Sequence, residues 1–265
     1  MPQLPVTQAL LDYDVTGHGP GVVQLHGLTS SRARDAALLL DLSRRVEGHR
    51  VIRYDARGHG ASSGDTEPAS YTWGNLATDL LCLLDEESPG EPVHGVGQSM
   101  GAGTLLHAAV RRPERFSSLV LCIPPTAWAS RVAQRAGYLA TATLVEECGV
   151  SALMDLARTA TRPPAVDPQI PVSPPTVPAD LLPTVFRGAA ESDLPSPEAI
   201  SAIDVPALVL AWDEDPGHPL DTAHRLHDLL PTSRLVIAHS PDDVATWPEL
   251  VAAHVAAVHG HPYAS

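Results

Sequence analysis

The stretch Gly97-Gln98-Ser99-Met100-Gly101 joins an apolar run over 92–96 to a helical pattern that starts near residue 102. Glycines two residues either side of Ser99 leave room for a sharp turn, which holds the serine in a strained backbone conformation and exposes its hydroxyl. The helix that follows offers unpaired backbone N–H groups at its first turn, where they can stabilise a developing negative charge. This stretch therefore predicts a strand–turn–helix unit with Ser99 as a candidate nucleophile.

Apolar runs and helical patterns alternate on both sides of this unit. Short buried strands are predicted at 22–25, 51–54, 92–96, 119–123, 207–212 and 235–238. Helical spacing of apolar residues lies between them, and a last helix is predicted from Trp247 onward. Such alternation favours an α/β fold with a mostly parallel sheet covered on both faces.

The alternation stops between the fourth and fifth of these runs. Residues 130–161 form an Ala-rich helical pattern, and residues 162–183 then hold eight prolines, which exclude a regular helix or an inner strand. A disordered linker is one interpretation of this composition. We expect instead an ordered lid over the site, because the strand and helix patterns resume after it. The predicted core comprises 1–125 and 202–265, and the predicted cap comprises 126–201.

Composition limits the class of protein. A chain of 265 residues can form one large core, and 31 acidic against 17 basic side chains give a net charge of −14. This charge repels nucleic acid and anionic membrane surfaces. The three cysteines form no C-x-x-C motif, no signal peptide is recognisable near the start, and no run approaches 18 apolar residues. We therefore expect a cytoplasmic protein.

Two further segments carry candidate site residues. In His26-Gly27-Leu28, at the end of an early strand, the N–H of Leu28 can act beside that of Met100 as a second oxyanion donor. The loop 55–62 reads Asp-Ala-Arg-Gly-His-Gly-Ala-Ser, and we interpret its charged residues as a buried, paired network beneath the site.

Taken together, these three segments resemble the α/β-hydrolase superfamily, specifically its small esterase, lactonase and perhydrolase-like members. The resemblance covers about 20–125 and 203–260. It implies an eight-stranded, mostly parallel sheet, a cap inserted after the sixth strand, and a serine nucleophile that needs no cofactor or metal. Serine at position 99 excludes the relatives that use an aspartate nucleophile. Histidines at 224, 227, 254, 259 and 261 lack the spacing of a complete metal site.

In this family a carboxylate follows the next-to-last strand, usually after a glycine. Counting from the end of the strand at 207–212 indicates Asp215, with Asp213 and Glu214 as alternatives and with Trp212 where glycine is usual. The bulky Trp212 can narrow a substrate pocket.

The family's histidine position falls at about 241–243, where this chain has Pro241, Asp242 and Asp243. We expect His239, at the end of the last strand, to be the base. His218 is the alternative, and a site without a conventional base is a third possibility.

These residues predict a serine hydrolase that cleaves a small-to-medium carboxylic ester, thioester or lactone. We expect His26, Gln98, Trp128 and Trp212 to line the substrate pocket. The expected partner is a small-molecule substrate, with a homodimer as the assembly if copies associate. The alternative is a member of the fold that has lost hydrolysis and binds a ligand, or assists proton transfer or elimination.

Overall fold

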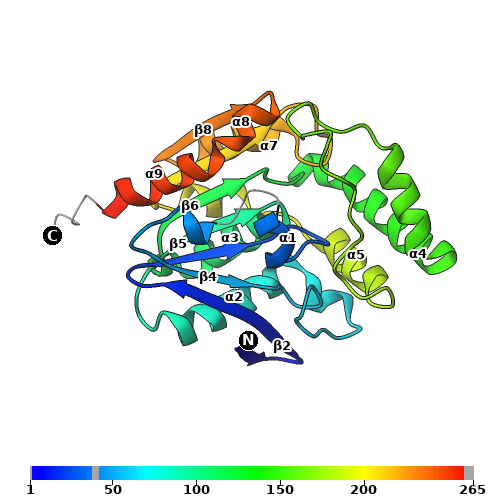
Figure 1. Cartoon of the computed structure of the whole chain (residues 1–265), viewed down its shortest axis with the longest axis horizontal. Helices are drawn as coiled ribbons and strands as arrows, with labels where there is room; N and C mark the ends of the chain where they lie inside the picture. Colours follow the sequence, from blue (N-terminus) through cyan, green and yellow to red (C-terminus); the bar gives the residue numbers. More distant parts are fainter. Residues whose placement is uncertain (1, 38–41, 260–265) are drawn as a thin grey trace.

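The computed structural model describes residues 2–37 and 42–259 and contains an eight-stranded sheet in the order β1-β2-β4-β3-β5-β6-β7-β8 (Figure 1). The strands are β1 (Gln3–Val6), β2 (Ala9–Gly17), β3 (Gly21–Leu25), β4 (Arg50–Tyr54), β5 (Val93–Gln98), β6 (Phe116–Cys122), β7 (Ala207–Trp212) and β8 (Ser233–Ala238). β1 and β2 pair antiparallel, β2 pairs antiparallel with β4, and β3 to β8 are parallel. The predicted mostly parallel sheet is confirmed.

Helices cover both faces of the sheet because successive strand residues point to opposite sides. In β6, Leu119 and Leu121 join a core cluster that contains residues of α2, α3 and α7, whereas Val120 joins a second cluster with residues of α9. The helices of this core are α1 (Arg32–Ala37), α2 (Trp73–Glu87), α3 (Met100–Arg111), α7 (Leu220–Leu229), α8 (Pro241–Ala245) and α9 (Trp247–His259). Short 3₁₀ turns lie at η1 (Leu42–Arg44), η2 (Pro68–Tyr71), η3 (Pro113–Arg115) and η4 (Trp128–Ser130).

The segment between β6 and β7 forms a separate helical layer at one end of the sheet, on the right in Figure 1. It holds α4 (Arg131–Thr159), which kinks at Gly149, and then α5 (Leu182–Glu191) and α6 (Pro197–Ser201). A third apolar cluster joins α4 and α5 to Tyr71 of η2. The end of the segment packs differently, because Ile200 of α6 belongs to the main core.

Three details differ from the elements read from the sequence. The first two strands lie within 3–17, a region for which no individual strand was predicted. Residues 241–243, which lie between the last predicted strand and the last predicted helix, begin α8, whose N-terminus is capped by the Ser240 side chain. The eight prolines lie mostly in irregular backbone, but Pro183 occupies the first turn of α5, a position where proline costs no hydrogen bond.

Candidate active site

Ser99 occupies a tight turn between β5 and α3. Its φ of 51° and ψ of −110° lie outside the regions that a serine ordinarily adopts. Both flanking glycines are sterically required, because a Cβ on Gly97 would lie 2.4 Å from the Gly101 carbonyl oxygen and a Cβ on Gly101 would lie 2.5 Å from the Leu25 carbonyl oxygen. The backbone N–H of Ser99 donates to the Cys122 carbonyl at 3.0 Å, which ties the turn to β6. The geometry matches the predicted strand–turn–helix unit.

The side chains of Ser99, His218 and Asp215 form a continuous chain of hydrogen bonds. Ser99 Oγ lies 2.8 Å from His218 Nε2, and His218 Nδ1 lies 2.8 Å from Asp215 Oδ2. The carboxylate accepts from Nδ1–H, so Nε2 is left to accept the serine proton. Asp215 and His218 both belong to the loop between β7 and α7, and their side chains are only 15% and 24% exposed. This arrangement is the one that activates a serine hydroxyl.

Asp215 is held ionised by several donors. Partial burial opposes its charge, but hydrogen bonds from His218, from the indole N–H of Trp212 and from the N–H of Gly217 outweigh burial and lower the pKa of Asp215 to about 2. The same turn places His218, because the His218 N–H donates to the Asp215 carbonyl. Asp215 therefore has the contacts expected of the acid, whereas Asp213 contacts a different histidine.

His239 does not reach Ser99, contrary to our sequence-based prediction. Its side chain is 67% exposed, and its Nδ1 lies 2.7 Å from Oδ2 of Asp213. This hydrogen bond raises the pKa of His239. The reason lies in the backbone, because Ser240 caps α8 immediately after β8 and leaves no loop that could carry His239 back over the turn. The alternative base, His218, is the histidine that the structure places on the serine.

The two predicted oxyanion donors belong to segments next to Ser99. Met100 is the first residue of α3, so its N–H belongs to the helical turn that lacks intrahelical partners. Gly27 approaches Ser99 so closely that a Cβ on Gly27 would lie 3.6 Å from the serine Cβ, and this contact brings the Leu28 backbone to the site. Leu28 lines the same cavity as Ser99, and the two N–H groups remain the candidate oxyanion donors.

His26 is buried next to the site and connects its loop to the residue after Asp55. It is 3% exposed, its Nε2 accepts the Ala56 N–H at 2.9 Å, and its Nδ1 is 2.8 Å from the Gly27 carbonyl oxygen, to which it donates. Burial lowers the pKa of His26 to about 4, so the ring is neutral at physiological pH. His26 therefore fixes the loop that carries Leu28.

The loop 55–62 forms the paired network expected from the sequence. Asp55 accepts from the Arg32 guanidinium at 2.8 Å and from the Ala61 N–H at 2.9 Å. Arg57 forms hydrogen bonds with Asp79 at 2.8 and 3.0 Å. These buried charges are paired and lie in the scaffold of the site, not at its reacting atoms.

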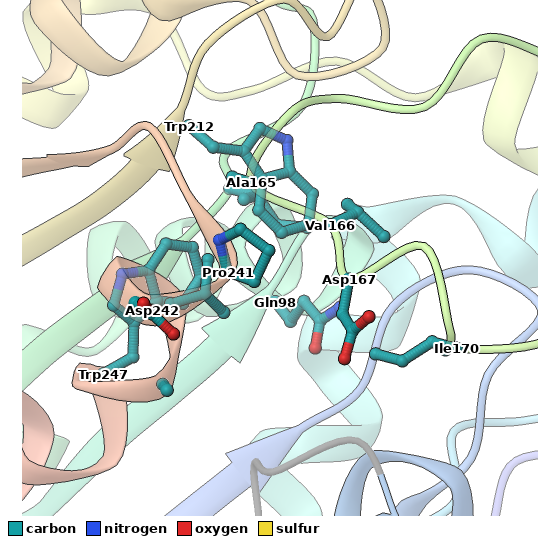
Figure 2. A pocket seen from close by; sticks show the side chains of 12 residues that line it. Gln98, Ala165, Val166, Asp167, Ile170, Trp212, Pro241, Asp242 and Trp247 are labelled. Atoms are coloured by element: carbon teal, nitrogen blue, oxygen red, sulfur yellow. The ribbon is translucent and has the colours of Figure 1, made fainter.

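Two cavities that share Gln98 and Ile123 lie at the site, and Ser99 lines one of them. The first, which we call the nucleophile chamber, has a volume of about 180 Å³. Its lining comprises Gly27, Leu28, Thr29, Ser30, Arg34, Gln98, Ser99, Ile123 and His218. The second, the apolar pocket, has a volume of about 290 Å³ (Figure 2). Its lining comprises Gln98, Ile123, Ala165, Val166, Asp167, Ile170, Trp212, Pro241, Asp242, Val244, Ala245 and Trp247.

Of the four predicted pocket residues, Gln98 and Trp212 line the apolar pocket. His26 and Trp128 line neither cavity. The Trp128 indole N–H donates instead to the Pro195 carbonyl at 3.0 Å, which holds the start of the cap segment against its end.

The sequence analysis missed Ile123, which lines both cavities. Its φ of 41° is a rare conformation for a β-branched residue, and Thr29, Ser99 and Glu214 near the site also have positive φ. Backbone strain of this kind concentrates at functional sites. Nothing in the local sequence signals it, because Ile123 simply ends an apolar strand.

Within the described ranges, no group of three or more His, Cys, Asp or Glu side chains is arranged to hold a metal ion; His261 lies outside those ranges. No helix in the described part of the chain combines the length and apolar character needed to cross a bilayer.

Comparison with known proteins gives a family model and several relatives that match part of the chain. Residues 20–142 match the family model described as alpha/beta hydrolase fold. The chain is 34% identical over 104 residues to human palmitoyl-protein thioesterase ABHD10, mitochondrial, a match covering 39% of this chain and 33% of that protein. It is 32% identical over 176 residues to 3-oxoadipate enol-lactonase 2 of Acinetobacter baylyi, covering 63% of this chain and 61% of the relative.

Among solved structures, a thermophilic esterase from Thermogutta terrifontis superimposes with a TM-score of 0.77 at 22% identity, covering 98% of this chain and all of that one (100%). The sheet order, the turn at Ser99 and the family match agree. The chain has the α/β-hydrolase fold, and residues 20–142 match the model of that family.

Proposed function

We propose that this protein is a serine hydrolase that cleaves a small-to-medium carboxylic ester, thioester or lactone. The observation that carries this proposal is the hydrogen-bonded chain from Ser99 Oγ through His218 to Asp215, with 2.8 Å at each step. The names of the relatives, a thioesterase and an enol-lactonase, lie in the same reaction class.

The reaction begins when Ser99 Oγ attacks the substrate carbonyl carbon and His218 Nε2 takes the hydroxyl proton. Asp215 holds the resulting imidazolium, and the N–H groups of Leu28 and Met100 stabilise the oxyanion. The C–O or C–S bond then breaks, and the leaving group takes the proton from His218. Water, deprotonated by His218, then attacks the acyl-serine. As the acyl–oxygen bond breaks and the carboxylic acid leaves, His218 returns the proton to Ser99 Oγ.

A protein of this fold that has lost its base is the rival function. It rested on the absence of histidine from 241–243. The contact between Ser99 and His218 argues against it, because a histidine three residues after the acid supplies the same three groups in the order Ser, Asp, His.

The test is labelling with a fluorophosphonate, which reacts only with an activated serine. We expect one adduct, located at Ser99 by peptide mass spectrometry, and loss of both labelling and ester turnover in Ser99→Ala. A folded wild-type protein that neither labels nor turns over a panel of p-nitrophenyl esters, thioesters and lactones would establish the non-hydrolytic alternative.

A further inference from the structure

We propose that the apolar pocket binds the acyl group of the substrate, that this group is an uncharged apolar chain, and that Asp167 and Asp242 exclude acyl chains ending in a carboxylate. The proposal rests on the hydrolase function proposed above and specifies its substrate class.

The walls of the apolar pocket come from five separate parts of the chain. Trp212 ends β7 and stacks on Trp247 of α9, with ring centroids 5.8 Å apart and planes at 21°. The proline-rich segment supplies Val166 and Ile170 from the opposite side, as Figure 2 shows. A volume of about 290 Å³ is near the lower end for small-molecule pockets, which start at about 300 Å³. The pocket thus fits a chain of modest length.

The connection between the two cavities indicates which part of the substrate enters the pocket. They share Gln98 and Ile123, but His218 lines only the nucleophile chamber. The leaving group must receive its proton from His218 and therefore departs on the histidine side. The acyl group, which stays bonded to Ser99, is left to extend past Gln98 and Ile123 into the apolar pocket.

The charges of the pocket are all of one sign. Asp167 and Asp242 are its ionisable lining residues, and no arginine is among the lining residues that the structure describes. One oxygen of Asp167, Oδ1, accepts the Gln169 N–H at 2.8 Å, which orients this carboxylate at the lining. A carboxylate at the end of an acyl chain would lose water in the apolar part and meet these two like charges. An uncharged acyl chain loses no hydrated charge on entering the pocket and is not repelled by the two carboxylates.

The proposal is tested first by binding, without catalysis. Octanamide and suberamic acid are amides of equal chain length, and the second ends in a carboxylate. By titration calorimetry on Ser99→Ala, we expect octanamide to bind on the order of tenfold or more tighter, as expected for like charges near a protein surface. Asp167→Asn combined with Asp242→Asn should reduce this ratio, whereas Asp180→Asn, an exposed carboxylate of the same segment, should not. Equal affinities, or a ratio unchanged by the double variant, would overturn the charge selection.

Kinetics tests the acyl assignment. For p-nitrophenyl esters from acetate to octanoate, kcat/KM should rise by up to about fourfold per added methylene until the pocket is full. Ala245→Trp, which places an indole at the pocket rim, should lower the octanoate-to-acetate ratio at least tenfold, whereas Ala256→Trp, exposed on α9 outside the pocket, should not. An unchanged ratio in Ala245→Trp, with Ser99-dependent turnover intact, refutes this inference alone. Absence of any Ser99-dependent turnover refutes the proposed function, and the acyl assignment with it.

Discussion

Trp212 donates its indole N–H to Oδ2 of Asp215 at 2.8 Å, and this oxygen also accepts from His218. One side chain therefore lines the apolar pocket and also contacts the proposed catalytic acid. A glycine, usual at this position in the family, could do neither.

Trp212→Phe removes the N–H and keeps an aromatic wall. Because this hydrogen bond helps to lower the pKa of Asp215, its loss should raise that pKa and lower kcat on the order of tenfold, the worth of a hydrogen bond to a charged group. The decline of activity in acid should shift to higher pH. Trp247→Phe is the matched control, since the buried Trp247 indole N–H has no partner among the described residues. Equal effects of the two variants would show that Trp212 acts by packing alone.

Gly101→Ala should destabilise the fold, because the new Cβ would lie 2.5 Å from the Leu25 carbonyl oxygen and 2.8 Å from the Leu25 Cβ. Forced overpacking costs about 1–3 kcal/mol, measured as a lower midpoint in urea. Gly137→Ala in α4, where nothing lies within 4 Å of the new Cβ, should instead stabilise by up to about 1 kcal/mol. A neutral result for Gly101→Ala would mean that the turn is not as closely packed as described.

Stability should depend on pH through three buried groups. Burial lowers the pKa of His26 to about 4 and that of His59 to about 3. The free energy of unfolding should therefore decrease as pH falls below about 6.5, the pKa of histidine in the unfolded chain, because only the unfolded state takes up these protons. Burial raises the pKa of Asp35 to about 7, which has the opposite effect because the native state holds that proton. Between about pH 4 and 6.5 unfolding of Asp35→Asn should therefore take up about one proton more than unfolding of the wild type.

The measurement is the free energy of unfolding against pH for wild type, Asp35→Asn and the exposed control Asp180→Asn. The slope should steepen by about 1.4 kcal/mol per pH unit in Asp35→Asn only. Parallel curves for wild type and Asp35→Asn would contradict burial of an uncharged Asp35.

Thr176 ties the proline-rich segment to the loop that carries Leu28. Its backbone N–H donates to the Thr29 carbonyl at 3.0 Å, and its hydroxyl donates to the Ser30 carbonyl. Thr176→Val keeps the shape and removes the hydroxyl, so we expect faster proteolysis within 160–180 and a KM raised severalfold. Thr159→Val, whose hydroxyl bonds only within its own helix, should change neither. An unchanged digestion pattern in Thr176→Val would show that the Thr176 hydroxyl does not hold the proline-rich segment in place.

Much of this architecture could be predicted because it depends on local chemistry. The glycines around Ser99 are required by contacts within one turn, and the alternating residues of β6 follow the strand repeat. The first two strands were not recognised because the apolar repeat is weak in the edge strand β1 and in its neighbour β2, where Gln3, Leu10 and Thr16 are exposed.

The base could not be chosen from the sequence because chain order allows both histidines. What decides between them is how the backbone turns after each strand. The Asp215–Gly217 turn directs His218 inward, whereas the capping of α8 by Ser240 leaves His239 at the surface. Ile123 gave no signal for a related reason, since its unusual φ depends on long-range contacts such as its N–H bond to the Leu210 carbonyl.

The most direct test compares His218→Ala with His239→Ala, using one activated ester and the same folded-state check. Loss of the general base should lower kcat by a factor of about 10²–10⁴ in His218→Ala, with far-UV circular dichroism unchanged. His239→Ala, which removes an exposed ring paired with Asp213, should retain wild-type turnover. Full activity in His218→Ala, or a comparable loss in His239→Ala, would contradict the assignment of Ser99, His218 and Asp215.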